Sequence, residues 1–112
     1  MRETNVFIAD ILESILKIEE FTKGISKDKF DKDVKLQDAI VRRIEIIGEA
    51  VKNIPDSFRK KHPGILWKEI AGMRDIITHS YFRVDLDAIW QVVRKDLPEL
   101  KTQLSQVLKQ ES

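Results

Sequence analysis

The feature that most limits the fold of this chain is a helical repeat of apolar residues that fills four long stretches. Between residues 4 and 23, and again between 33 and 54, large apolar residues recur every three or four positions. That spacing gathers them on one face of an α-helix, whereas a half-buried strand would alternate apolar and polar residues. Similar stripes begin at Leu66 and Leu86. The sequence therefore predicts an all-α, four- to five-helix up-and-down bundle.

Residue types near the ends of these stretches predict where the helices begin and end. We expect Thr4 to cap the first helix, and Gly24 to end it because glycine readily takes the left-handed conformation found at helix C-termini. Asp33 should begin the second helix and Asp85 should cap the last one. Because Pro98 lies inside the last stripe, we expect a kink in the C-terminal helix rather than an end.

Two polar segments join these helices. ISKDKFDKD, around the apolar anchor Phe30, is predicted to be a loop or a short turn. IPDSFRKKHPGI, bounded by Pro55 and Pro63, is predicted to be a connector that can contain one helical turn. SYFRVD, residues 80–85, is poor in helix formers and should break the third helix.

Length and composition predict one soluble domain over residues 1–112. Apolar residues make up 42% of the chain and charged residues 35%, which suits a small globular protein. The chain has no cysteine, so thiolate metal ligands and cysteine nucleophiles are excluded. The N-terminal stripe is interrupted by acidic residues, so we expect neither a signal peptide nor a membrane span, and a cytoplasmic location. Net charge is only +1, and the local basic clusters are predicted to be solvated faces.

One stretch, MRDIITHSYFRVD, departs from the pattern of the rest. It places Arg74, Asp75, His79 and Tyr81 within eight positions. In a helix Asp75 and His79 lie one turn apart, so the carboxylate could accept a hydrogen bond from the imidazole. Arg74 and His79 are about 140° apart around a helix axis, and the tyrosine would point away from the histidine. The four side chains therefore converge only if the helix opens after Thr78, facing a cleft.

These residue types suit metal-free cleavage of RNA. His79 would remove the proton from a ribose 2′-hydroxyl, while Arg74 would bind the phosphate and stabilise the negative charge that develops on it. The leaving oxygen also needs a proton, and the only other histidine, His62, is expected in an exposed loop. A symmetric dimer that brings two copies of His79 together would supply both base and acid. This chemistry needs no metal and no cofactor.

Structural roles for the same residue types stay open at this point. A histidine at a helix end is often a cap or a packed surface residue, and a tyrosine is often a packed ring. Trp67 and Trp90 are expected in the core or at an interface rather than as platforms for stacked bases. Glu45 and Glu49, one turn apart, are interpreted as a solvated or salt-bridged pair rather than a metal site.

RDIITHSY resembles the R-x-x-x-x-H-x-Y pattern of the HepT-like toxins, a branch of the HEPN superfamily of small helical ribonucleases. RRIEIIGEA, WKEIAGMRDIITHSYFRVD and DLPEL resemble further landmarks of that family, so the similarity covers nearly the whole chain. It implies a helical bundle that forms a homodimer with both motifs lining a shared cleft. It also implies a metal-independent endoribonuclease that acts on RNA, either tRNA or mRNA.

The resemblance further implies a role for each motif residue. Arg74 and His79 would be catalytic, and Asp75 would support them at a position where asparagine is also frequent. Tyr81 would line the site and receive AMP from the partner, an MntA-like minimal nucleotidyltransferase that acts as antitoxin in a type VII toxin–antitoxin system. The same bundle also occurs as a non-catalytic helical partner, or substrate-binding module, of a nucleotidyltransferase, and this is the alternative function.

Overall fold

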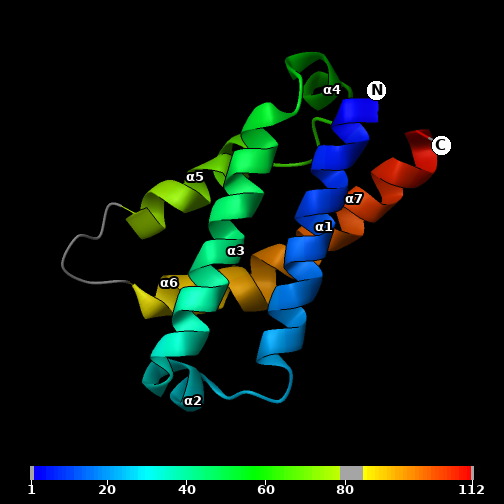
Figure 1. Cartoon of the computed structure of the whole chain (residues 1–112). Helices are drawn as coiled ribbons and strands as arrows, with labels where there is room; N and C mark the ends of the chain where they lie inside the picture. The colour runs from blue at the N-terminus through cyan, green and yellow to red at the C-terminus, as the bar shows by residue number, and fades with distance from the viewer. Residues whose placement is uncertain (1, 79–84, 112) are drawn as a thin grey trace.

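The structure is a computed structural model that describes residues 2–78 and 85–111, with residues 2, 74, 76–78 and 111 described as backbone only. Every regular element in these ranges is helical (Figure 1). In chain order the elements are α1 (Arg2–Thr22), α2 (Lys27–Lys32), α3 (Val34–Asn53), α4 (Asp56–Lys61), α5 (Trp67–Thr78), α6 (Leu86–Gln91), the π-helical segment η1 (Val92–Asp96) and α7 (Leu97–Glu111). The prediction of an all-α fold is confirmed.

Four principal helical rods build the bundle, because α6, η1 and α7 follow one another without a break. α3 lies beside α1 on one side and α5 on the other, and α7 packs against α1 (Figure 1). The buried stripes of these helices meet in one apolar core, which includes Ile8, Ile11, Ile15, Ile40, Ile44, Ile47, Val51, Ile70, Met73, Leu97, Leu100 and Leu104. None of the helices in the described ranges is long and apolar enough to cross a membrane.

The first helix begins earlier than expected. α1 starts at Arg2, so Thr4 lies inside the helix and is buried, and its prediction as an N-cap is wrong. Phe21, expected in the buried stripe, is 36% exposed, and Thr22 is buried instead. The hydroxyl of Thr22 donates a hydrogen bond of 2.8 Å to the carbonyl of Ile18, which satisfies it inside the core.

Three other predicted boundaries, at Gly24, Asp33 and Asp85, are confirmed, whereas the predicted break of the third helix falls largely on residues 79–84, outside the described residues. Gly24 follows α1 with φ +72°, the left-handed conformation expected of it. The Asp33 carboxylate accepts a hydrogen bond of 3.0 Å from the amide of Leu36, and Asp33 is therefore the N-cap of α3. At α6, the Asp85 carboxylate accepts a 3.0 Å bond from the amide of Ala88 in the same way.

Each connector contains a short helix that contributes an aromatic ring to the core. The predicted loop or turn around Phe30 is the six-residue helix α2, and its phenylalanine is fully buried. Gln37 of α3 donates a 2.9 Å hydrogen bond to the Phe30 carbonyl, which holds α2 against α3. The second connector contains α4, where Phe58 is buried, so the predicted helical turn is confirmed.

The C-terminal helix continues through its proline. Pro98 lies in the first turn of α7, directly after the π-helical segment η1, where the Leu97 amide bonds to the Val92 carbonyl. Proline has no amide hydrogen to give to a carbonyl four residues earlier, so the hydrogen-bond ladder must change at this point. The chain changes direction between α6 and α7 (Figure 1), and the predicted kink is confirmed.

The cap of α3 gives a direct test of this fold. Asp33→Ala removes the acceptor of the Leu36 amide, and we expect the free energy of unfolding to fall by about 0.5–2 kcal/mol. Asp38, exposed inside α3, is the matched control, and Asp38→Ala should change that value by less than about 0.5 kcal/mol. Urea denaturation followed by circular dichroism measures both, and equal losses would contradict a specific role for the cap.

Candidate active site

The start of α5, the helix that carries the first motif residues, is fixed by the aromatic ring of its first residue. Trp67 is buried, and its indole N–H donates a 3.0 Å hydrogen bond to the carbonyl of His62. Its ring meets that of Phe58 edge-on, with the centroids 6.4 Å apart. α4 therefore holds the N-terminal end of α5, and the prediction that Trp67 is a core residue is confirmed.

The middle of α5 is fixed by packing against α3. Ile70 and Met73 are buried in the core. Arg74 and Asp75 follow directly, in the last turns of α5 that the structure describes, and Asp75 is exposed. The side chain of Arg74 and all of His79 and Tyr81 lie outside the described residues. The convergence of the four motif side chains, and the predicted opening of the helix after Thr78, therefore stay predictions.

The chain on the other side of residues 79–84 is held by different contacts. Lys27 of α2 reaches Asp87 in the first turn of α6 at 2.6 Å, and also pairs with Asp31 at 2.8 Å. These two carboxylates, Asp31 more than Asp87, raise the pKa of the Lys27 ammonium above its usual value. Lys27 and Asp31 are about one-third exposed and Asp87 is 86% exposed, so these contacts contribute little to stability.

An aromatic stack strengthens the attachment of α6 and η1 to α2. The rings of Phe30 and Trp90 lie 4.9 Å apart, and the Arg94 guanidinium lies 4.4 Å from the centre of the Trp90 ring. Arg94 also donates a 2.7 Å hydrogen bond to the carbonyl of Ile25. Trp90 is thus a packing residue, as expected. The described residues before and after 79–84 are each anchored, by α3 and α4 on one side and by α2 on the other.

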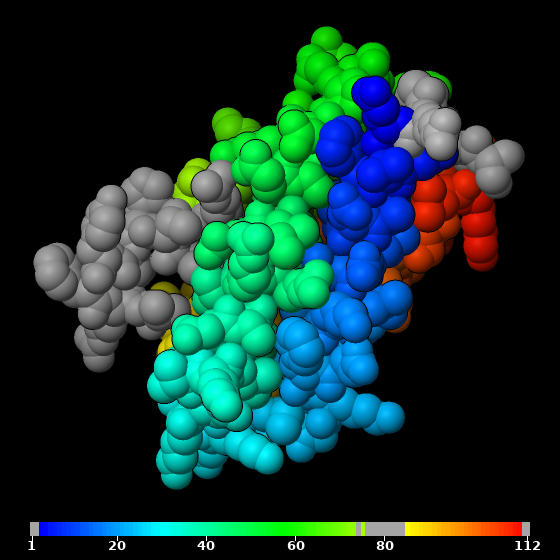
Figure 2. Space-filling model, viewed as in Figure 1, coloured from blue at the N-terminus to red at the C-terminus, as the bar shows by residue number. Residues whose placement is uncertain are grey.

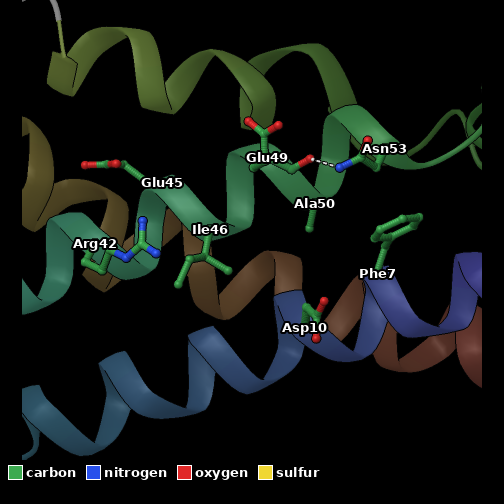
Figure 3. A pocket seen from close by; sticks show the side chains of 8 residues that line it. All are labelled: Phe7, Asp10, Arg42, Glu45, Ile46, Glu49, Ala50 and Asn53. Atoms are coloured by element: carbon green, nitrogen blue, oxygen red, sulfur yellow. Dashed lines mark hydrogen bonds between the residues drawn. The ribbon is translucent and has the colours of Figure 1, made fainter.

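A groove of about 470 Å³ with a mixed polar and apolar lining opens between α3 and α1 (Figure 3). The carboxylates of Glu45 and Glu49 point to the side of α3 nearer α5, and Asn53 donates a 3.1 Å hydrogen bond to the Glu49 carbonyl. The groove is lined by Phe7, Asp10, Arg42, Glu45, Ile46, Glu49, Ala50 and Asn53. Because acidic and basic groups share this groove, it does not form a uniformly positive surface for phosphates.

The interpretation of Glu45 and Glu49 as surface residues is consistent with their positions, half-buried and exposed respectively. Within residues 2–78 and 85–111, no group of three or more histidine, aspartate or glutamate residues is placed to hold a metal ion. Arg42 joins these glutamates in one groove, which was not predicted. The spacing 42–45–49, which puts all three on one helical face, was the available signal.

The second histidine differs from its prediction. His62 is half-buried rather than part of an exposed loop, and its ring lies 4.9 Å from that of Phe58. The physical reason is that the proline-bounded connector folds as α4, which turns its last residues back onto the core. Other basic residues pair with acids at the surface, as in Lys101 with Glu19 at 2.9 Å. Figure 2 shows the face of the molecule on which α1 and α3 lie side by side.

Comparison with known proteins gives a consistent result. A family model described as "Ribonuclease HepT-like" matches residues 11–107. A Thermococcus cleftensis protein named "Probable ribonuclease HepT" is 47% identical over 103 residues, which cover 92% of this chain and 94% of that protein. A Caldanaerobacter subterraneus protein named "Putative RNase" is 46% identical over 111 residues, which cover 99% of both chains. No solved structure gives a match.

One relative is a longer protein. The Methanocaldococcus jannaschii protein named "Gamma-glutamylcyclotransferase and putative RNase" is 49% identical over 109 residues. The match covers 97% of this chain, which spans about half (49%) of that relative. A family match over most of the length, together with relatives nearly half identical along almost all of it, shows that the chain belongs to the HepT-like ribonuclease family.

Proposed function

We propose that this protein is a metal-independent endoribonuclease, the toxin of a toxin–antitoxin pair, and that it acts as a homodimer. The observation that carries the proposal is the position of the R-x-x-x-x-H-x-Y motif. It begins with Arg74 in the last described turns of α5, and the described chain on both sides of residues 79–84 is anchored to the bundle. Catalytic groups must be held within fractions of an ångström, and rigid flanking helices favour that.

The proposed reaction is an attack of a ribose hydroxyl on the neighbouring phosphate. His79 removes the proton of the 2′-hydroxyl, and the oxygen bonds to phosphorus while the bond to the 5′-oxygen breaks. Arg74 holds two phosphate oxygens through its planar guanidinium and stabilises their developing charge. Asp75 orients the imidazole. The products are a 2′,3′-cyclic phosphate and a 5′-hydroxyl end.

The departing 5′-oxygen must receive a proton from a second group. We propose that His79 of a second copy supplies it, which makes the dimer cleft the complete site. His62 is a poor alternative acid because its half-buried ring packs on Phe58, at the C-cap of α4. The substrates we expect are tRNA or mRNA in the cytoplasm.

Control of this toxin would act on Tyr81. We propose that a nucleotidyltransferase antitoxin directs the tyrosine oxygen onto the α-phosphorus of ATP, which forms a Tyr–AMP bond and releases pyrophosphate. The added phosphate and adenosine would place negative charge and bulk where the RNA backbone binds. Inhibition would then follow from electrostatic repulsion and steric blockage together.

The central test is RNA cleavage in the presence of a chelator. We expect His79→Ala to lower the rate by about 10²–10⁴-fold, because general acid–base catalysis is lost. Arg74→Lys should lower it by about 10²–10³-fold, because an ammonium cannot form the bidentate contact. Analysis of the product ends should find cyclic phosphate.

The chain offers a matched control for each substitution. His62→Ala and Arg43→Lys change the same residue types at positions outside the proposed site and should retain wild-type rates once circular dichroism confirms folding. If His62→Ala lost activity as severely as His79→Ala, the assignment of the base would be wrong. If chelator abolished cleavage, the reaction would depend on a metal.

Modification is tested with the antitoxin and labelled ATP. Tyr81 is the only tyrosine in the chain, so Tyr81→Phe should remove tyrosine-linked label completely while RNA cleavage persists. Antitoxin should then fail to neutralise the variant. Neutralisation of Tyr81→Phe together with loss of label would show that complex formation, and not AMP transfer, controls the toxin.

Expression alone separates the proposed enzyme from a non-catalytic partner of a nucleotidyltransferase. An active ribonuclease should arrest growth when it is produced without antitoxin, and His79→Ala should relieve the arrest. A binding module should be harmless in both forms.

A further inference from the structure

A second groove, of about 440 Å³, lies between α5 on one side and η1 with the start of α7 on the other. Its floor is apolar, since Ile70, Met73 and Leu100 contribute to it and all three are buried. Leu66 lines the same groove and is 62% exposed. A large exposed apolar side chain beside an apolar groove is the pattern of a surface that binds another molecule.

The walls of this groove favour a helical occupant. Both walls are helical, and the described residues contain no strand to which an extended peptide could add. One end is bounded by a 3.3 Å hydrogen bond from the Gln103 side-chain amide to the Gly64 carbonyl. One wall is the π-helical segment η1, and π-helical turns occur frequently at functional sites.

The charged side chains that line the groove indicate the charge of a helix that could bind there. Three carboxylates, those of Glu69, Asp96 and Glu99, line the groove around its apolar floor. Among the described residues none forms an ion pair with these three, and none of those that line the groove is basic. A helix whose apolar stripe is bordered by lysine or arginine would match this surface. A helix whose stripe is bordered by acidic residues would be repelled.

The same charges argue against a second copy of this chain as the occupant. A twofold interface centred on the groove would bring the three carboxylates of one copy, those of Glu69, Asp96 and Glu99, close to the same three of the other copy. Like charges placed together across an interface oppose association. The groove is therefore more suited to a different protein than to the dimer of the proposed nuclease.

We propose that the groove between α5 and α7 receives an amphipathic, basic helix of a partner protein. Its apolar residues, spaced i, i+3, i+4 and i+7, would cover Leu66 and the floor, and its flanking lysine or arginine side chains would meet the three carboxylates. Met73 on the floor directly precedes Arg74, and η1 follows α6. The bound helix thus contacts the described chain on both sides of residues 79–84. Binding itself does not depend on the proposed nuclease activity.

Three synthetic peptides of about 18 residues test the proposal, all with the same leucine stripe and flanked by lysine, glutamine or glutamate. Each is titrated into the ¹⁵N-labelled full chain, with fluorescence anisotropy for affinity and amide shifts for location. We expect the lysine peptide to bind at least about tenfold more tightly than the glutamate peptide at low salt, and to shift amides of α5 and η1. Equal binding of both peptides, or shifts confined to other helices, would overturn the proposal. So would the absence of binding by all three.

Substitutions at exposed positions confirm the location without disturbing the core. Leu66→Asp and Glu99→Lys should each weaken binding of the lysine-flanked peptide by about tenfold or more. The matched controls are Val34→Asp, at a residue 66% exposed on α3, and Glu13→Lys, at an exposed residue on α1; both should bind as the wild type does. If Leu66→Asp instead dissociated a dimer in sedimentation experiments while Val34→Asp did not, the groove would be a contact between copies and the proposal would be wrong.

Discussion

The packing of α3 against two neighbours at once is the constraint on which the rest of the structure depends. Its buried isoleucines, including Ile44 and Ile47, face both α1 and α5. Gly48 is buried in the same helix, where a small residue suits close contact with a neighbouring helix. Since α5 carries Arg74 and Asp75, the position of the candidate site is set by the same side chains that form the core. Core substitutions on α3 would therefore disturb both stability and site.

The described chain on the two sides of residues 79–84 is held by unrelated parts of the sequence. α5 is fixed through Trp67 to the connector before it, while α6 is fixed through Trp90 to α2, some 60 residues earlier in the chain. The two six-residue helices α4 and α2 thus hold the helices that lie before and after residues 79–84. Both connectors position the flanks of the motif, and each does so through one tryptophan.

Much of this fold could be predicted from the sequence, because helical periodicity and capping residues act locally. The aspartates at 33 and 85 and the glycine at 24 end or begin helices as their chemistry requires. The errors have tertiary causes. Thr22 is buried in place of Phe21, with its hydroxyl satisfied by its own helix, whereas Val34 and Leu66, at or just before a helix start, remain 66% and 62% exposed.

For the candidate site, the sequence predicted the residue types and their order, and the structure fixes only the helix that carries the first two. Helical spacing could have indicated that Arg42, Glu45 and Glu49 share one face, but the grooves beside α3 and between α5 and α7 combine side chains of different helices, whose common surface depends on packing. His62 shows the same limit. A proline-bounded basic segment was expected to be exposed, and a single buried phenylalanine four residues earlier draws its imidazole inward.

The π-helical segment has a consequence for the alignment of the last helical rod. Leu97 lies eight positions after Ile89, and in a regular α-helix that step would place it about 80° past two full turns. Yet Ile89, Val93 and Leu97 are all buried. A wider turn winds through fewer degrees per residue, so η1 reduces this rotation and brings the three side chains closer to one line. One rod can thereby face α2 near its beginning and α1 farther along.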